Sequence, residues 1–164
     1  MHWVLFAILT AIYMIAPFRR GLFFDQDLYW MEAVVLLSLS VWLIYQLVKK
    51  ERGIPAIYYA VFLIPAWYAI SFFYAESPKY NFDNWLRWMS YASLLIVLLG
   101  IRSHGKIRQW MEYVFQAAGI AIALFAFFGY LGWVDYPDIV LDHRLTGSFQ
   151  YANTFAAVMG AYWL

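Results

Sequence analysis

The stretch richest in residues that could do chemistry runs from Arg144 to Asn153 and leads into a long apolar segment. Ser148 or Thr146 is expected to cap the helix formed by that segment, and Gly147 allows a tight turn into it. The open end of the helix then presents free N–H donors and a partial positive charge, and Arg144 adds a permanent, forked cation beside it. Together these groups suit a phosphate or pyrophosphate at a membrane surface.

Polar side chains continue into the same segment. Gln150, Asn153 and Thr154 fall on roughly one helical face, because spacings of three and four residues bring side chains together. They could donate hydrogen bonds to a sugar or a phosphate. The plainer alternative is a capped helix with Arg144 snorkelling to the membrane surface, and the residues alone leave both interpretations open.

The pattern Arg-x-x-Gly-x-Phe-x-x-x-Asn, formed by Arg144, Gly147, Phe149 and Asn153, resembles the O-antigen ligase and polymerase family of bacteria. Members often carry Asn-Pro-Asn where this chain has Tyr-Ala-Asn at 151–153, so the proline is missing. The resemblance implies a multi-pass membrane glycosyltransferase that acts outside the bacterial plasma membrane, in cell-surface polysaccharide biosynthesis. Its donor is implied to be a glycan linked to undecaprenyl diphosphate, with Arg144 contacting the diphosphate and Asn153 shaping the site. The family also uses an arginine and a histidine in a later external loop that has no counterpart here, so we expect no transferase activity from these residues alone.

A second candidate is the acidic pair Asp25 and Asp27. Two carboxylates one residue apart can share a divalent cation and leave room for a substrate phosphate. The pair resembles the Asp-x-Asp element in the first external loop of metal-dependent glycosyltransferases that use polyprenyl phosphates. We favour the structural alternative, a helix start, since acids stabilise the first turn and aspartate caps well. The histidines His2, His104 and His143 show no metal-ligand spacing, and we expect neither a metal nor another cofactor.

Two ionisable side chains fall near the outer ends of predicted spans. Arg87 lies at most one turn inside its span, on the same face as Tyr91, and an ionisable residue inside a span is by default a candidate for a functional site. We therefore include Arg87 among the candidate diphosphate or glycan ligands, with a snorkelling arginine as the equal alternative. Glu32 is similarly placed, and a Glu32–Arg87 pair is possible.

The composition of the chain indicates the kind of fold that must position these residues. Of the 164 residues, 65% are hydrophobic and 13% charged, against about 25% charged in a soluble domain. This excludes a disordered chain and an ordinary cytosolic enzyme. The apolar residues come in blocks near the roughly 20 residues that a spanning helix needs, without the alternation of a transmembrane barrel. The sequence predicts an all-α polytopic transmembrane bundle in a single domain, with five complete spans and a sixth cut short, at 2–18, 28–48, 54–74, 85–101, 109–133 and 149–164.

The distribution of Lys and Arg predicts the orientation of the spans. The loops after the second and fourth spans carry six basic residues, and the other loops carry four, or five if Arg87 is counted. Because basic loops stay in the cytoplasm, the N-terminus is predicted to be cytoplasmic and the stretch 144–153 external. The six are Lys49, Lys50, Arg52, Arg102, Lys106 and Arg108, and the four are Arg19, Arg20, Lys79 and Arg144.

The last segment carries a stripe of small residues. Ala152, Ala156 and Gly160 recur every four residues, a spacing that lets another helix approach closely. The segment runs to Leu164 without a terminator, so we expect the chain to be the N-terminal portion of a longer protein. The stripe would then meet downstream helices or a partner's helix. No Gly-rich nucleotide loop and no basic face is present, so nucleic acid is not an expected partner.

These observations favour the N-terminal part of an O-antigen ligase-like transferase or polymerase, embedded in membrane lipid. The expected mechanism is inverting transfer of the glycan to an acceptor hydroxyl, with arginine cations assisting departure of the diphosphate. One alternative is a non-enzymatic small or truncated membrane protein that packs against partner helices. Another is a metal-dependent polyprenyl-phosphate glycosyltransferase using Asp25 and Asp27.

Overall fold

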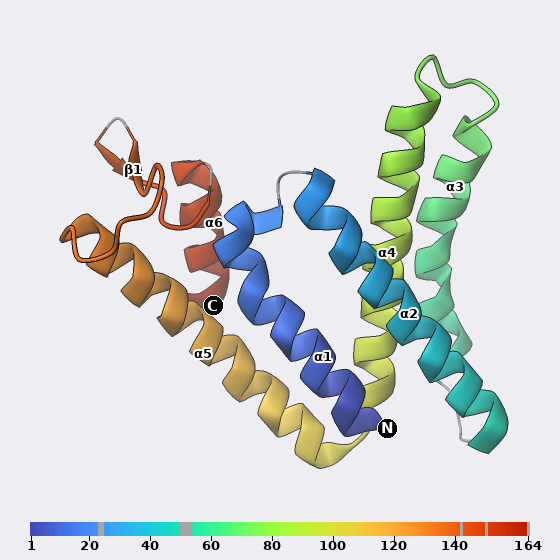
Figure 1. The fold of residues 1–164 in the computed structure, drawn as a ribbon. Coiled ribbons are helices and arrows are strands. Elements are labelled where there is room, and N and C mark those ends of the chain that lie inside the picture. The colour runs from blue at the N-terminus through green and yellow to red at the C-terminus, as the bar shows by residue number, and fades with distance from the viewer. Residues whose placement is uncertain (23–24, 50–53, 142, 150, 164) are drawn as a thin grey trace. The chain divides into compact units, whose positions relative to one another are not determined.

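The computed structural model describes residues 1–22, 25–49, 54–141, 143–149 and 151–163, without the side chains of 20–22, 25 and 163. The described part is all-α apart from one short hairpin, which confirms the all-α class of the predicted fold (Figure 1). The α-helices are α1 (His2–Ile15), α2 (Asp25–Lys49), α3 (Leu63–Ser71), α4 (Pro78–Arg102), α5 (Gly105–Tyr130) and α6 (Ala152–Trp163). The 3-10 helices are η1 (Ala16–Leu22) and η2 (Ala56–Phe62), and the strands are β1 (Val140–Leu141) and β2 (Arg144–Leu145).

Several helices are long enough to cross a membrane. By length and composition, 4 helical stretches in the described part qualify as spans. The third predicted span corresponds to a shorter apolar stretch, Ala56–Ser71, and the sixth to the 12 residues of α6. The four long stretches are His2–Arg19, Gln26–Lys49, Pro78–Arg102 and Gly105–Tyr130.

Three of the long helices, α2, α4 and α5, begin before the apolar segments that predict them. The fourth span was predicted from residue 85, but α4 begins at Pro78, because a proline in the first turn lacks only an N–H that would be unsatisfied there anyway. Likewise α5 begins at Gly105 instead of residue 109. Hydropathy marks the part of a helix suited to lipid, whereas the polar turns outside it are also helical.

The third predicted span is divided into two helical forms. The 3-10 helix η2 ends at Phe62, and α3 starts at Leu63. The sequence predicts a kink at Pro65, which cannot donate the hydrogen bond to the carbonyl of Val61 that an α-helix requires there. The tighter 3-10 winding accordingly occupies the segment just before the proline.

The chain divides into two compact units. Unit 1 comprises Met1, Trp3–Leu28 and Gly105–Leu164, and unit 2 comprises His2 and Tyr29–His104. Unit 1 is therefore built from two stretches separated in sequence by nearly all of unit 2.

In unit 2, α3 packs against α4, and α2 contacts α4 through a large aromatic side chain. Trp42 of α2 is fully buried with its indole ring against Gly100, where a Cβ would overlap the ring. Nearer the start of both helices, the hydroxyl of Tyr29 donates to Asp83 at 2.8 Å. The contact that comes earlier in α2 also comes earlier in α4. The two helices therefore run in the same direction, as Figure 1 shows.

We expect Gly100→Ala to destabilise unit 2. The added Cβ would displace the Trp42 ring, and overpacking of this kind costs about 1–3 kcal/mol. Gly105→Ala is the matched control, because nothing lies within 4 Å of a Cβ at that position. Chemical denaturation in detergent should show a loss for the first variant alone, and an equal response of the two would contradict the packing of Trp42 on Gly100.

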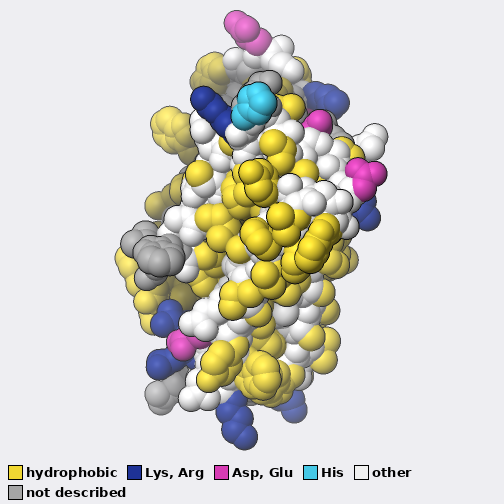
Figure 2. All heavy atoms as spheres, turned by 90° about the vertical axis from the view of Figure 1, so that its left-hand side faces the viewer, with side chains coloured by type: hydrophobic (Ala, Val, Ile, Leu, Met, Phe, Trp, Pro, Cys, Tyr) yellow, Lys and Arg dark blue, Asp and Glu magenta, His cyan; other side chains and the backbone are white. Residues whose placement is uncertain are grey.

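In unit 1, α1 and α5 run in the same direction, side by side (Figure 1). Tyr13 stacks on Phe115, with ring centroids 6.3 Å apart, and Phe18 meets the edge of Phe125 at 5.1 Å. The middle of the face shown in Figure 2 is covered mainly by hydrophobic side chains, and charged side chains lie toward its two ends. This distribution is the one expected of a surface that faces lipid between two aqueous layers.

Candidate anion-binding site

A two-stranded hairpin positions Arg144. Strands β1 and β2 are antiparallel, with Val140 opposite Leu145 and Leu141 opposite Arg144. His143, in the turn between them, has a φ of 62°, a left-handed conformation typical of tight hairpin turns. Arg144 thus projects from a strand that its partner strand holds in register.

The hairpin is fixed to the end of α5 by one isoleucine. The carbonyl oxygen of Ile139 accepts hydrogen bonds from the N–H groups of Thr146, at 3.0 Å, and Gly147, at 3.3 Å. The hydroxyl of Thr146 donates to the carbonyl of Asp138. The Ile139 side chain is buried in the space that a Cβ on Gly129 of α5 would occupy. The base of the hairpin is therefore tied to a membrane-span candidate.

A tight turn at Gly147 connects the hairpin to α6. Gly147 has a φ of 63°, and the N–H of Phe149 donates to the carbonyl of Thr146 at 3.1 Å. This confirms the predicted turn at Gly147. We call residues 144–149 the Arg144 loop.

The helix α6 starts later than the sequence predicts. It begins at Ala152 instead of residue 149, and the N–H of Phe155 donates to the carbonyl of Tyr151. Tyr151 is thus the N-cap residue, and the prediction that Ser148 or Thr146 caps this helix is wrong. The reason is local: the Thr146 hydroxyl is used inside the hairpin, and the turn separates it from the helix.

The Ser148 side chain is fully buried, and its hydroxyl has no hydrogen-bond partner within the described residues. Leaving such a group unsatisfied costs about 1–3 kcal/mol. Because the side chain is fully buried, the hydroxyl is not accessible to a ligand in this conformation of the loop.

Two features of the loop suit an anion, the exposed Arg144 and the acid-free first turn of α6. Arg144 is exposed and makes no ion pair with any residue in the described ranges. The first turn of α6 contains no acidic residue that would offset the positive end of the helix dipole, and Asn153 lies exposed in that turn. Strand β2 packs against α6, so the cation and the helix start belong to one local assembly. Gln150, the remaining predicted ligand of this loop, lies outside the described residues.

Arg87 lies in the other unit. It is half-buried on α4 in unit 2, whereas Arg144, Gly147 and Asn153 belong to unit 1. Glu32 of α2 is buried. A contribution of Arg87 to the same site as Arg144 stays a prediction, and so does the Glu32–Arg87 pair.

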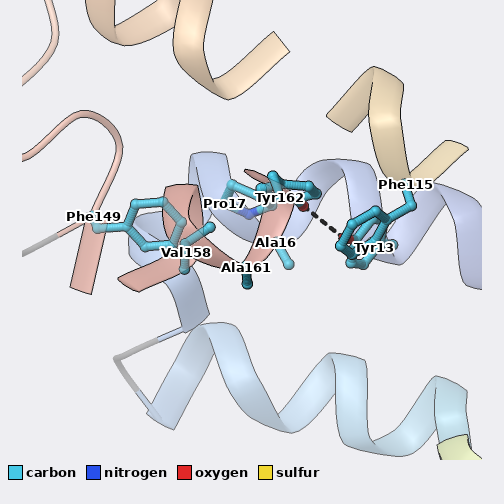
Figure 3. Close-up of a pocket in the computed structure, with 8 residues that line it drawn as sticks. All are labelled: Tyr13, Ala16, Pro17, Phe115, Phe149, Val158, Ala161 and Tyr162. Atoms are coloured by element: carbon cyan, nitrogen blue, oxygen red, sulfur yellow. Dashed lines mark hydrogen bonds between the residues drawn. The ribbon is translucent and has the colours of Figure 1, made fainter. Parts of the chain in front are cut away.

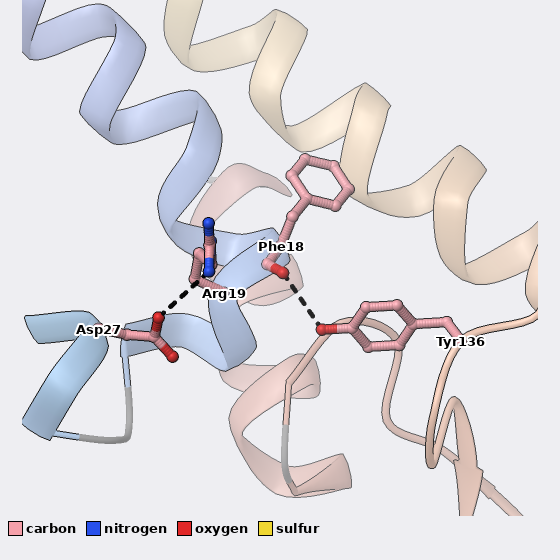
Figure 4. A network of polar contacts seen from close by, with 4 residues as sticks. All are labelled: Phe18, Arg19, Asp27 and Tyr136. Carbon is pink, nitrogen blue, oxygen red and sulfur yellow. Dashed lines mark hydrogen bonds and ion pairs between the residues drawn. The ribbon is translucent and has the colours of Figure 1, made fainter.

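The acidic pair opens a helix, in agreement with the favoured structural interpretation. Helix α2 begins at Asp25, whose side chain lies outside the description, and the carboxylate of Asp27 pairs with Arg19 at 3.5 Å (Figure 4). Nearby in unit 1, the hydroxyl of Tyr136 donates to the carbonyl of Phe18 at 3.2 Å. No group of three or more His, Asp or Glu side chains suited to a metal occurs in the part of the chain described.

The fold brings together two histidines that are distant in sequence. The rings of His2 and His104 have centroids 3.8 Å apart at an interplanar angle of 34°, and Tyr45 meets His2 edge-on at 5.3 Å. The sequence offers no signal for this contact, because the residues lie at the ends of different helices. The rings are tilted toward a stacked arrangement, which is not the arrangement of two ligands directed at one metal.

The small-residue stripe of α6 is largely uncovered within unit 1. Ala156 and Gly160 are exposed, and a Cβ on Gly160 would have nothing within 4 Å. The stripe therefore has the space that close approach of another helix requires.

No family model matches this chain, and no match was found among the curated proteins or the solved structures.

Proposed function

We propose that the chain takes part in an O-antigen ligase-like glycan transfer, binding the diphosphate of an undecaprenyl-diphosphate-linked donor at the Arg144 loop. The observation that carries this proposal is the exposed Arg144 on a hairpin that packs against α6, whose first turn contains no acidic residue. Arginine binds phosphate oxygens in a planar, two-pronged geometry, and a helix N-terminus adds N–H donors.

The loop supplies chemistry suited to diphosphate departure. When the bond from the sugar to the diphosphate breaks, negative charge accumulates on the leaving phosphate. A cation and oriented donors that are already in place stabilise that charge without reorganising. The role of Arg144 is electrostatic, and that of Asn153 is to hydrogen bond to the phosphate or the glycan. The acceptor hydroxyl and its general base are not assigned to residues of this chain.

A binding comparison tests the proposal. The protein in native membranes should retain undecaprenyl diphosphate more strongly than undecaprenyl monophosphate, because the second phosphate meets the helix start as well as the arginine. Addition of EDTA should leave this preference unchanged. Equal retention of the two lipids would contradict a diphosphate site, and loss of binding in EDTA would favour the metal-dependent alternative at Asp25 and Asp27.

We propose that the Arg144 loop faces the outside of a bacterial plasma membrane and that the N-terminus is cytoplasmic. The support is the excess of basic residues in the loops after α2 and α4. Single cysteines are informative because the chain has none of its own. In intact cells, an impermeant thiol reagent should label Val140→Cys and leave Glu51→Cys unlabelled. The opposite pattern would place the Arg144 loop in the cytoplasm and would contradict binding of a donor on the outer side of the membrane.

A second candidate function is non-enzymatic packing against partner helices. The observation that favours it is the exposed stripe of Ala156 and Gly160 on α6. Gly160→Leu should then weaken assembly with other helices while leaving lipid retention intact. The two functions are compatible, because the stripe and the Arg144 loop use different parts of unit 1.

A further inference from the structure

Two histidine rings meet within unit 2, one at the start of α1 and the other in the turn between α4 and α5. The ring centroids of His2 and His104 are 3.8 Å apart, and the ring planes are tilted by 34°. Tyr45 of α2 meets the His2 ring edge-on, with centroids 5.3 Å apart. Because His2 is the first residue of α1, the contact holds the start of that helix against the turn. We call this contact the His2–His104 clasp.

The hydrogen bonds around His104 indicate which ring nitrogen can take up a proton. The Ser103 hydroxyl donates to the carbonyl of Gly100 at 2.8 Å, and its oxygen lies 3.3 Å from Nδ1 of His104. A serine hydroxyl has a single hydrogen, so in this arrangement Nδ1 donates and the Ser103 oxygen accepts. A further proton is then added at Nε2. Protonation of His104 therefore acts on the contact with the His2 ring and leaves the Ser103 bond in place.

The clasp accommodates one added proton better than two. Histidine changes its charge between about pH 5 and 8. His104 is exposed, whereas the His2 residue is only 7% exposed. One proton on the exposed ring leaves a cation beside a neutral ring, but a second would place two like charges 3.8 Å apart, one of them away from water. Separated rings can both be protonated in water. Separation of the rings therefore takes up a proton, and acid favours it.

The charged groups along the segments that meet at the clasp are mainly basic. In the described residues they are the N-terminal amine of Met1, Lys49 in the last turn of α2, Arg102 in the last turn of α4, and Lys106 and Arg108 in the first turn of α5. The loop after α2 adds Lys50, Glu51 and Arg52, which lie outside the described residues. The sum of these charges is positive, so it opposes a second protonated histidine.

The later part of α1 is held by other contacts. The hydroxyls of Tyr13 and Tyr162 are 2.6 Å apart and hydrogen bond to each other, and Tyr13 stacks on Phe115 (Figure 3). Tyr13 follows His2 by 11 residues, or about 16 Å along the helix at 1.5 Å per residue. Opening of the clasp therefore frees the first turn of α1 and leaves the packing around Tyr13 intact.

We infer that the His2–His104 clasp is an acid-sensitive device, which holds the start of α1 against the α4–α5 turn near neutral pH and releases it when both rings are protonated. The inference does not depend on the Arg144 loop or on the proposed function. The segments that meet at the clasp carry the basic residues on which the proposed orientation rests. In that orientation, the clasp responds to the pH on the side of the membrane opposite the Arg144 loop.

Hydrogen exchange in the first turn of α1 measures the opening. The N–H groups of Val4 and Leu5 donate to the carbonyl of Met1 at 2.9 and 3.1 Å, and they lose this protection when the turn frays. In the protein in lipid nanodiscs, we expect these amides to exchange faster at about pH 5.5 than at about pH 7.5, after correction for the intrinsic rates. If opening takes up one proton, the open population rises by up to about tenfold per pH unit. The amides around Tyr13 should keep their protection.

Two substitutions remove the proton sites and keep the ring contact. His2→Phe and His104→Phe each retain a flat ring that cannot be protonated, so the corrected exchange should differ by less than about twofold between the two pH values. His143→Asn is the matched control, because it removes the third histidine, which lies in the hairpin turn of unit 1. Asparagine tolerates the left-handed backbone there, and this variant should keep the full acid response.

The unaltered protein alone can overturn the inference. Equal corrected exchange of Val4 and Leu5 at both pH values would show that the clasp does not open in acid, whether or not a phenylalanine variant folds. An acid response that persists in both phenylalanine variants, or that disappears in His143→Asn, would assign the response to other groups and would also overturn the clasp.

Discussion

Arg144→Ala is expected to slow glycan transfer from the lipid-linked donor by about 10- to 10⁴-fold, in membranes that also supply the acceptor and the general base not assigned to this chain. Charge-assisted hydrogen bonds are worth roughly 1.5–3 kcal/mol each, and about 1.36 kcal/mol corresponds to a factor of ten in rate, so the range covers loss of one or two bonds. The fold should survive, because Arg144 is exposed and the hairpin is held by backbone bonds to Ile139. Transfer measured at matched membrane abundance checks the result.

Arg144→Lys distinguishes diphosphate binding from simple anchoring. Lysine retains the charge and loses the planar fork, so activity should return only in part. A snorkelling arginine at the interface predicts instead that both variants stay within a few-fold of the parent, since lysine snorkels equally well. Near-parental transfer by Arg144→Ala would remove the phosphate role and leave the family resemblance as a sequence pattern.

Gly147→Ala is expected to lower the free energy of unfolding by about 2–5 kcal/mol. The left-handed backbone, with φ at 63°, costs a residue with a Cβ about 1–2 kcal/mol. The new Cβ would also lie 2.8 Å from the ring of Phe155, and overpacking adds about 1–3 kcal/mol. Chemical denaturation in detergent measures the sum.

Alanine substitutions at two other glycines separate the cost of the left-handed backbone from the cost of overpacking. Gly132 has a φ of 75° with nothing within 4 Å of its Cβ position, so alanine there should show the backbone cost alone. Gly160 lies inside α6 with no neighbour in reach, and alanine there should be neutral or stabilising by up to about 1 kcal/mol. An equal loss in all three variants would mean that neither the turn nor the contact with Phe155 explains the result.

The sequence predicts the helices well because their signal is local. Blocks of apolar residues identify the long helices. Gly147 is recognisable as a turn residue because glycine allows a tight turn directly before an apolar segment. The predicted cap at Ser148 or Thr146 fails because α6 begins only at Ala152, beyond the turn at Gly147. The hairpin uses the Thr146 hydroxyl, and its position depends on the contact of Ile139 with Gly129, a packing contact that no sequence pattern indicates. The same limit explains why the sequence gives no hint of the histidine contact, since His2 and His104 are 102 residues apart in the sequence.

The division of unit 1 into two stretches of sequence has a consequence for the order of events during synthesis. Tyr13 packs on Phe115, which emerges from the ribosome 102 residues later. At about 5–20 residues per second, Tyr13 waits roughly 5–20 s for its partner on α5, while residues 29–104 of unit 2 are made. During that interval the apolar surface of α1 that later packs on α5 must be covered by lipid or by an insertion factor. Slowing translation between residues 29 and 104 should therefore expose the N-terminal helix to proteolysis for longer, a cost that a chain with sequential helix pairing would not have.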